Sequence, residues 1–108
     1  MAGFDDREKT FESKWAHDEE LRFRVYARRN KLLGLWAADV MGLGSDEADA
    51  YAKEVISADF EEAGDEDVYR KVKGDFEAKG ADVTEHHLRK QMQDLLEEAH
   101  SQVILEKK

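Results

Sequence analysis

A basic cluster is the first group of residues in this 108-residue chain whose types and spacing could do chemistry. Arg28, Arg29 and Lys31 stand within four positions of one another, and their cationic side chains could hold a phosphate or a carboxylate of a partner. Charged side chains on a helix are more commonly solvated than engaged with a ligand. We favour a solvated helix flank and keep a weak contact site for an anion, such as an adenine nucleotide, as the alternative.

Three other polar groups resemble ligand sites, but their spacing argues against each of them. Residues 65–67 open like a calcium loop, yet Arg70 stands where such a loop needs glycine, and no glutamate occupies the twelfth position. His86 and His87 are adjacent, so a helix would point them about 100° apart, and neither has a further ligand at i+4. The turn at residues 42–45 lacks the lysine of a phosphate-binding loop. We therefore expect no metal site and no enzymatic activity.

Aromatic side chains dominate the N-terminal segment, residues 1–17. Phe4, Phe11 and Trp15 are spaced i, i+7, i+11, which places them in one stripe of a helix, and charged residues such as Arg7 and Lys14 occupy the remaining surface. A helix this short is marginal in water unless it docks on something. Two interpretations stay open: the segment packs on its own domain, or it folds when it binds a partner protein.

A core helix is expected at residues 19–41, because residues 32–38 form an uncharged run in a chain that is 40% charged. The face that helical spacing predicts to be buried comprises Leu21, Val25, Leu32, Trp36 and Val40, with Arg28 in the same series, and Leu33 and Leu35 widen it around Gly34. A glycine inside a helix costs about 1 kcal/mol relative to alanine. We therefore expect another backbone or a bulky side chain to come close at Gly34, and Tyr51, Phe60 and Phe76 are the candidates for the contact.

Three further amphipathic helices follow this one. Their expected N-terminal caps are Ser45, Asp65, and either Asp82 or Thr84. The expected apolar stripe of the second helix is Ala48, Tyr51, Ala52, Val55, Ile56, Phe60 and Ala63. That of the third helix is Val68, Val72 and Phe76. That of the fourth helix is Leu88, Met92, Leu95, Leu96, Ala99 and Val103. Gly42 or Gly44 should end the helix at residues 19–41, and Gly64 and Gly80 should end the second and third helices. The prediction is an all-α protein, a small four-helix bundle at residues 18–108 with a mobile N-terminal segment at residues 1–17.

Composition supports a small helical domain and narrows the classes of partner. The chain has no proline, which favours helices. It also has no cysteine, so it has no disulfide and no thiolate chemistry. Residues 1–38, 39–85 and 86–108 carry net charges of +1, -10 and 0, and this acidic balance argues against nucleic acid. No apolar run reaches the roughly 20 residues of a membrane span, and no signal peptide is recognisable. We expect a soluble, cytoplasmic protein.

Four stretches of the sequence are specific enough to carry a resemblance. They are FESKWAHDEE at residues 11–20, ARRNKLLGLWAA at 27–38, YAKEV at 51–55 and GDEDV at 64–68. Together and in this order they resemble the zeta-type inhibitor subunit of the alphaproteobacterial F-type ATPase. The sequence departs from the family pattern at Trp15, where a phenylalanine is expected, and this change keeps the aromatic character.

The resemblance implies a four-helix bundle whose mobile N-terminal segment inserts into the catalytic head of the F-type ATPase and blocks ATP hydrolysis. It implies that the partner-binding residues are Phe4, Arg7, Phe11, Lys14 and Trp15. It also implies a location at the inner membrane through the ATPase, without insertion into the membrane. The alternative is an adenine-nucleotide-binding or structural helical module without enzymatic activity.

Overall fold

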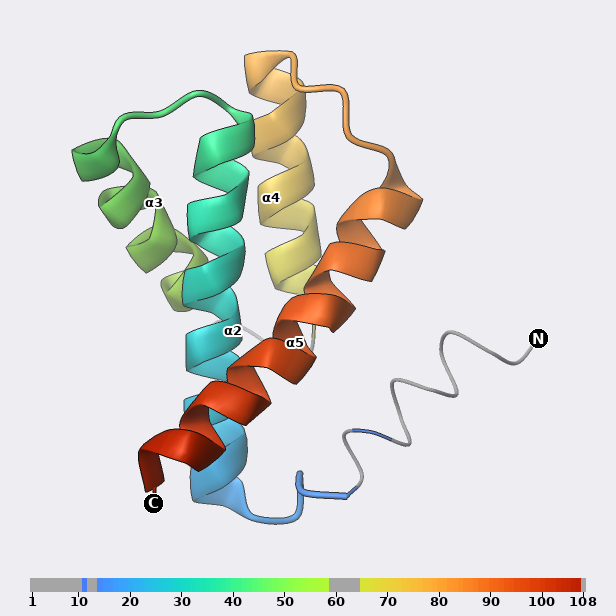
Figure 1. Cartoon of the computed structure of the whole chain (residues 1–108). Helices are drawn as coiled ribbons and strands as arrows, with labels where there is room; N and C mark the ends of the chain where they lie inside the picture. Colours follow the sequence, from blue (N-terminus) through green and yellow to red (C-terminus); the bar gives the residue numbers. More distant parts are fainter. Residues whose placement is uncertain (1–10, 12–13, 59–64, 108) are drawn as a thin grey trace.

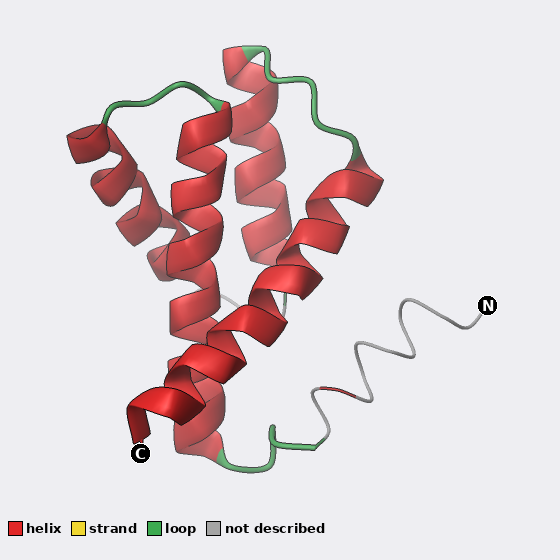
Figure 2. Cartoon of the chain, viewed as in Figure 1, coloured by secondary structure: helices red, strands yellow, loops and turns green. Residues whose placement is uncertain are grey.

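The structure is a computed structural model, and it describes residue 11, residues 14–58 and residues 65–107. Most of these residues lie in four helices. They are α2 (Glu19–Val40), α3 (Ser45–Ala58), α4 (Glu66–Lys79) and α5 (Glu85–Lys107). Figure 2 shows helices and connecting turns and no strand in these described ranges. The predicted all-α fold of four packed helices is confirmed.

Helix α2 is the axis of the bundle, because each of the other three helices packs against it. Helix α5 crosses α2 obliquely, so that the C-terminal end of α5 lies beside the N-terminal half of α2 (Figure 1). An ion pair of 2.7 Å between Arg28 and Glu106 joins these two parts of the chain. The bundle therefore has two ends, with α3 and α4 at one and the beginning of α2 at the other.

Local capping chemistry sets where the helices begin and end. The carboxylate of Asp18 accepts a hydrogen bond of 3.1 Å from the Leu21 amide and starts α2. Gly42, with φ of 77°, and Gly80, with φ of 73°, adopt the left-handed conformation after α2 and α4, as predicted. Thr84 rather than Asp82 caps α5, because its hydroxyl accepts a hydrogen bond from the His87 amide.

Helix α3 departs from its predicted beginning by one residue. Ser45 is its first residue rather than its cap, because the carbonyl of Gly44 accepts the hydrogen bond of the Ala48 amide. The Gly44 amide in turn lies 3.3 Å from the Glu47 carboxylate, which acts as in a capping box. The predicted positions Phe60, Ala63 and Gly64 lie outside the described residues.

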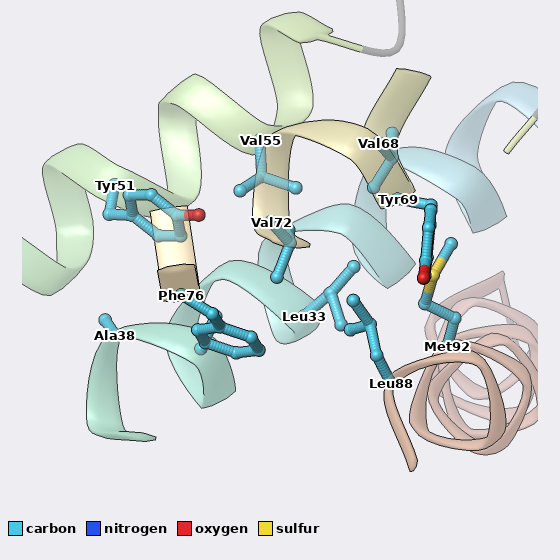
Figure 3. Packing of buried hydrophobic residues seen from close by; sticks show 11 residues of the cluster. Leu33, Ala38, Tyr51, Val55, Val68, Tyr69, Val72, Phe76, Leu88 and Met92 are labelled. Atoms are coloured by element: carbon cyan, nitrogen blue, oxygen red, sulfur yellow. The ribbon is translucent and has the colours of Figure 1, made fainter. Parts of the chain in front are cut away.

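Two apolar clusters form the core, and a buried polar layer separates them along α2 and α5. The larger cluster joins all four helices, as Figure 3 shows, through Leu33, Ala37, Ala38, Tyr51, Val55, Val68, Tyr69, Val72, Phe76, Leu88 and Met92. The smaller cluster joins Trp15 to α2 and α5 through Leu21, Val25, Leu96, Ala99 and Val103. Between the two, Arg29 and Asn30 on α2 and Gln93 on α5 are buried.

The predicted buried face of α2 is confirmed at Leu21, Val25 and Leu33, but its centre in the second half of the helix was misplaced by about one residue. Leu33, Ala37 and Ala38 are fully buried, whereas Leu32 and Trp36 are only partly buried and Val40 is exposed. The uncharged run at residues 32–38 has no polar position to mark its solvent side, so spacing alone could not orient it. The buried series runs Leu21, Val25, Arg29, Leu33, Ala37, with a second row at Asn30, Gly34 and Ala38.

Arg29 is the unexpected member of this buried series, and its charge has a specific partner. Its side chain is 0% exposed, and its guanidinium donates to the Asp65 carboxylate at 2.8 Å and to the Asn30 side-chain oxygen at 2.7 Å. Asp65 stands at the N-terminus of α4 as predicted, but its side chain makes no cap hydrogen bond and turns to Arg29 instead. The ion pair therefore ties α4 to α2.

The close contact predicted at Gly34 is confirmed, and of the two predicted kinds of partner it is a backbone that approaches. A Cβ atom built on Gly34 would lie 2.6 Å from the Cα atom of Ala52, so the backbone of α3 approaches here rather than a side chain of Tyr51 or Phe76. Phe60, the third candidate, lies outside the described residues. Only glycine permits this separation of α2 and α3, which explains why a residue with poor helix propensity stands inside α2.

We predict that Gly34→Ala destabilises the protein by about 1–3 kcal/mol, because the overlap with Ala52 must outweigh the roughly 1 kcal/mol that alanine adds through helix propensity. Gly74 on α4 is the matched control, since a Cβ there meets nothing within 4 Å. Gly74→Ala should stabilise the protein by about 0.5–1 kcal/mol. Urea unfolding of both variants measures this, and a Gly34→Ala protein as stable as the parent would contradict the close approach.

We further predict that Asp65→Asn costs about 3 kcal/mol, because it leaves the buried Arg29 guanidinium without its carboxylate. The matched control is Glu66→Gln, which breaks an exposed pair with Arg89 and should cost less than about 1 kcal/mol. Denaturant midpoints of the two variants give the comparison. Equal, small losses would mean that water or another group replaces Asp65 at little cost.

Candidate partner-binding surface

The chain that precedes α2 folds back onto the bundle through a short run of turns. The Lys14 amide donates to the Phe11 carbonyl at 3.3 Å, and the Asp18 amide donates to the Trp15 carbonyl at 3.2 Å. Because Asp18 also caps α2, these turns fix where Trp15 stands relative to the first turn of that helix. The indole is thereby placed in the smaller core cluster, with 6% of its surface exposed.

Four rings form what we call the aromatic cluster: Phe11, Trp15, Tyr26 and His100. The Trp15 ring stacks on the His100 imidazole with centroids 5.0 Å apart and planes inclined by 26°. Phe11 meets both rings edge-on, at 5.4 Å from His100 and 5.7 Å from Trp15, and Tyr26 lies 6.1 Å from Trp15. Edge-on and offset arrangements are favourable for aromatic rings. The cluster thus joins the N-terminal segment to α2 and α5.

Two polar groups weaken this otherwise apolar contact. The indole N–H of Trp15 is buried and has no hydrogen-bond partner among the residues that the structure describes. Burial lowers the pKa of His100, because the half-buried site disfavours the charged imidazole. A buried donor without a partner costs about 1–3 kcal/mol of desolvation. The free energy gained when Trp15 docks on the bundle is therefore smaller than the buried apolar area of the indole alone would give.

The five residues predicted to bind a partner fall into three groups. Trp15 is buried and Phe11 half-buried, both in the aromatic cluster, whereas Lys14 between them is exposed. Phe4 and Arg7 lie outside the described residues. The aromatic stripe had two interpretations, packing on the chain's own domain or binding to a partner protein. In the free protein, Phe11 and Trp15 pack on the chain's own domain. Their part in binding a partner stays a prediction.

The basic cluster does not form one surface. Arg29 is buried against Asp65, and Arg28 is part-buried, with Gln102 and Glu106 within 2.8 Å of its guanidinium. Lys31 is exposed. An anion at this place would compete with carboxylates that already neutralise both arginines, so no observation of the structure favours the nucleotide alternative, which stays a prediction.

Within the described residues, no group of three or more metal-ligating side chains is assembled. His87 instead lies 5.8 Å from the Trp36 ring, at the opposite end of α2 from His100. None of the helices traced in the described ranges has the length and apolar character that crossing a membrane requires.

Sequence reasoning missed the side chains of the bundle that meet the N-terminal segment. His100 and Tyr26 carry no motif, and each stands singly in a charged stretch. One signal was available: His100 follows Leu96 by four positions and precedes Val103 by three, so it borders the apolar stripe of α5. Of the two acids that hold the arginines, Asp65 was predicted only as a helix cap, and Glu106 could not be distinguished from the other acids.

Comparisons with known proteins identify the relatives of this chain. The family model described as ATPase inhibitor subunit zeta matches residues 1–102, which include the N-terminal segment as well as most of the bundle. A solution NMR structure is similar to this one with a TM-score of 0.71 and 50% sequence identity, over 80% of this chain and 98% of the solved chain. No protein with a curated function matches the chain.

We predict that Trp15→Ala destabilises the free protein by about 3–5 kcal/mol, the usual loss for a buried tryptophan. Trp15→Phe is the matched control: it keeps an aromatic ring, removes the unpartnered N–H and should cost less than about 1.5 kcal/mol. Urea unfolding followed by circular dichroism measures both. If Trp15→Ala left the midpoint unchanged, the indole would be dispensable for the bundle, as expected for a mobile N-terminal segment at residues 1–17.

Proposed function

Because this chain belongs to the ATPase inhibitor subunit zeta family, we infer that it inhibits an F-type ATPase and does so by inserting its N-terminal segment into the catalytic head. The family is one of regulators without catalytic activity. The observation that carries the proposal is the family match itself, because it spans residues 1–102 and so includes the segment that would insert.

The chemistry of the N-terminal segment supports this role. Aromatic side chains are the residue types that most often dominate protein interfaces, and Phe11 is only half-buried in the free chain. A helix that binds in a groove presents its anchors at spacings of three, four and seven residues, and the stripe Phe4, Phe11, Trp15 has this spacing. The remaining face would stay at the edge of the interface, where the exposed Lys14 can pair with acids of the partner.

The bundle has a different part in this proposal. Its described surface has few large exposed apolar side chains, namely Phe23, Val40 and Leu105. A small number of exposed apolar residues is normal for a folded domain. The bundle therefore serves as the folded body from which the N-terminal segment extends.

Steady-state ATP hydrolysis by a purified F-type ATPase head, with increasing concentrations of the full chain, tests the proposal. We predict that the parent inhibits and that Phe11→Ala raises the half-inhibiting concentration by at least about tenfold, since an interface anchor is commonly worth 2 kcal/mol or more. Phe23→Ala is the matched control, because Phe23 is a phenylalanine of α2 with 59% exposure. It should change the half-inhibiting concentration by less than about threefold.

Circular dichroism of both variants shows that the bundle stays folded. A parent that leaves hydrolysis untouched at micromolar concentration would remove the inhibitor function for this chain. If the parent inhibits and Phe11→Ala inhibits equally well, the active surface lies on the bundle rather than on the N-terminal segment.

A further inference from the structure

If the proposed function holds, Phe11 and Trp15 bind two different surfaces: the chain's own bundle in the free protein and the ATPase head in the complex. In the free chain their rings are packed against Tyr26 and His100, and Trp15 is almost completely buried. The same two side chains are the anchors that would enter the ATPase head. A side chain cannot fill both places at once, so binding to the head requires that the rings leave the bundle first.

The position on the bundle that the two rings fill is built by side chains from both crossing helices. Tyr26 comes from α2 and His100 from α5, and the apolar floor is made by Val25, Leu96 and Ala99. Arg28 holds the same two helices together just beyond this point, through Gln102 and Glu106. Because neither these contacts nor the caps of α5 involve the N-terminal segment, the site persists when the rings leave it.

We propose that the site between Tyr26 and His100 is an internal docking site for Phe11 and Trp15, which competes with the ATPase for the N-terminal segment. The proposal rests on the proposed function and deepens it. The docked state is the resting state, and the fraction of chains with released rings sets the apparent affinity for the ATPase. Apparent affinity falls in proportion to that fraction.

The polar composition of the site keeps the resting state reversible. The buried indole N–H of Trp15 has no hydrogen-bond partner within the described part of the chain, and the imidazole that stacks on it is half-buried. Docking therefore gains less than two apolar surfaces of the same shape would give. A partner that offers an acceptor to the indole N–H would satisfy a group that the bundle leaves unsatisfied. The competition therefore favours release when a suitable groove is present.

His100→Ala tests the proposal, because it removes two ring contacts from the docking site and changes nothing in the N-terminal segment. The expected result is inhibition at a concentration roughly two- to tenfold lower than for the parent, the factor that one aromatic pair commonly carries. His87→Ala is the matched control, since it removes a histidine beside the other tryptophan, Trp36, at the opposite end of α2. It should leave the half-inhibiting concentration unchanged.

A second readout reports docking directly. In a Trp36→Phe background Trp15 is the only tryptophan of the chain, and acrylamide quenching of its fluorescence measures its exposure. We expect stronger quenching in His100→Ala than in the parent, with melting curves that show both to be folded. Unchanged quenching would overturn the assignment of His100 to the docking site.

The two readouts together separate the possible failures. Exposed Trp15 with equal or weaker inhibition would overturn the competition, because release would then bring no gain. Absence of inhibition by the parent and by every variant would remove the proposed function, and the competition with it. In that case a rise in quenching would still show that His100 holds the indole.

Discussion

At Gly34 the backbone of α3 comes so close to α2 that any side chain at this position would overlap Ala52. This contact sets the separation of the two helices and thereby the depth at which Tyr51 and Val55 enter the larger cluster (Figure 3). Helix α4 then closes the cluster, tied to α2 by the ion pair of Arg29 with Asp65 and to α3 by the hydrogen bond of Tyr51 to Asp75. Packing density in protein cores leaves little room to adjust such a contact.

The polar layer of Arg29, Asn30 and Gln93 gives the smaller cluster a degree of independence from the larger one. Burying charged and polar groups rarely adds stability, but it restricts how neighbouring helices can slide past each other. Here it would fix the register of α5 on α2. The site between Tyr26 and His100 lies on one side of this layer, and the contact of α2 with α3 lies on the other. Release of the N-terminal rings can therefore occur without disturbing the larger cluster.

The positions of the helices could be predicted well because capping residues and glycines mark most of their ends. A side-chain cap stands before α2 at Asp18 and before α5 at Thr84. A left-handed glycine follows α2 at Gly42 and α4 at Gly80. The rotation of α2 could not be predicted, since residues 32–38 are all uncharged and any of them could face the core. The burial of Arg29 was missed because its partner, Asp65, is 36 residues away and looked like a helix cap.

The position of Trp15 shows a limit of a different kind. An amphipathic stripe predicts that its aromatic side chains will be buried, but it does not predict which surface will cover them. In the free chain that surface is the chain's own bundle, and the family match suggests a second surface on the ATPase. The two interpretations of the N-terminal segment are thus two states of one segment in our account, and both depend on the same rings.

Photo-crosslinking from position 11 tests this account most directly. The full chain would carry a benzoylphenylalanine in place of Phe11 and would be irradiated alone and in the presence of the purified ATPase head. The account predicts crosslinks to α5 near His100 in the free protein and crosslinks to subunits of the head in the complex. Crosslinks that remain within the chain while the ATPase is bound and inhibited would contradict it.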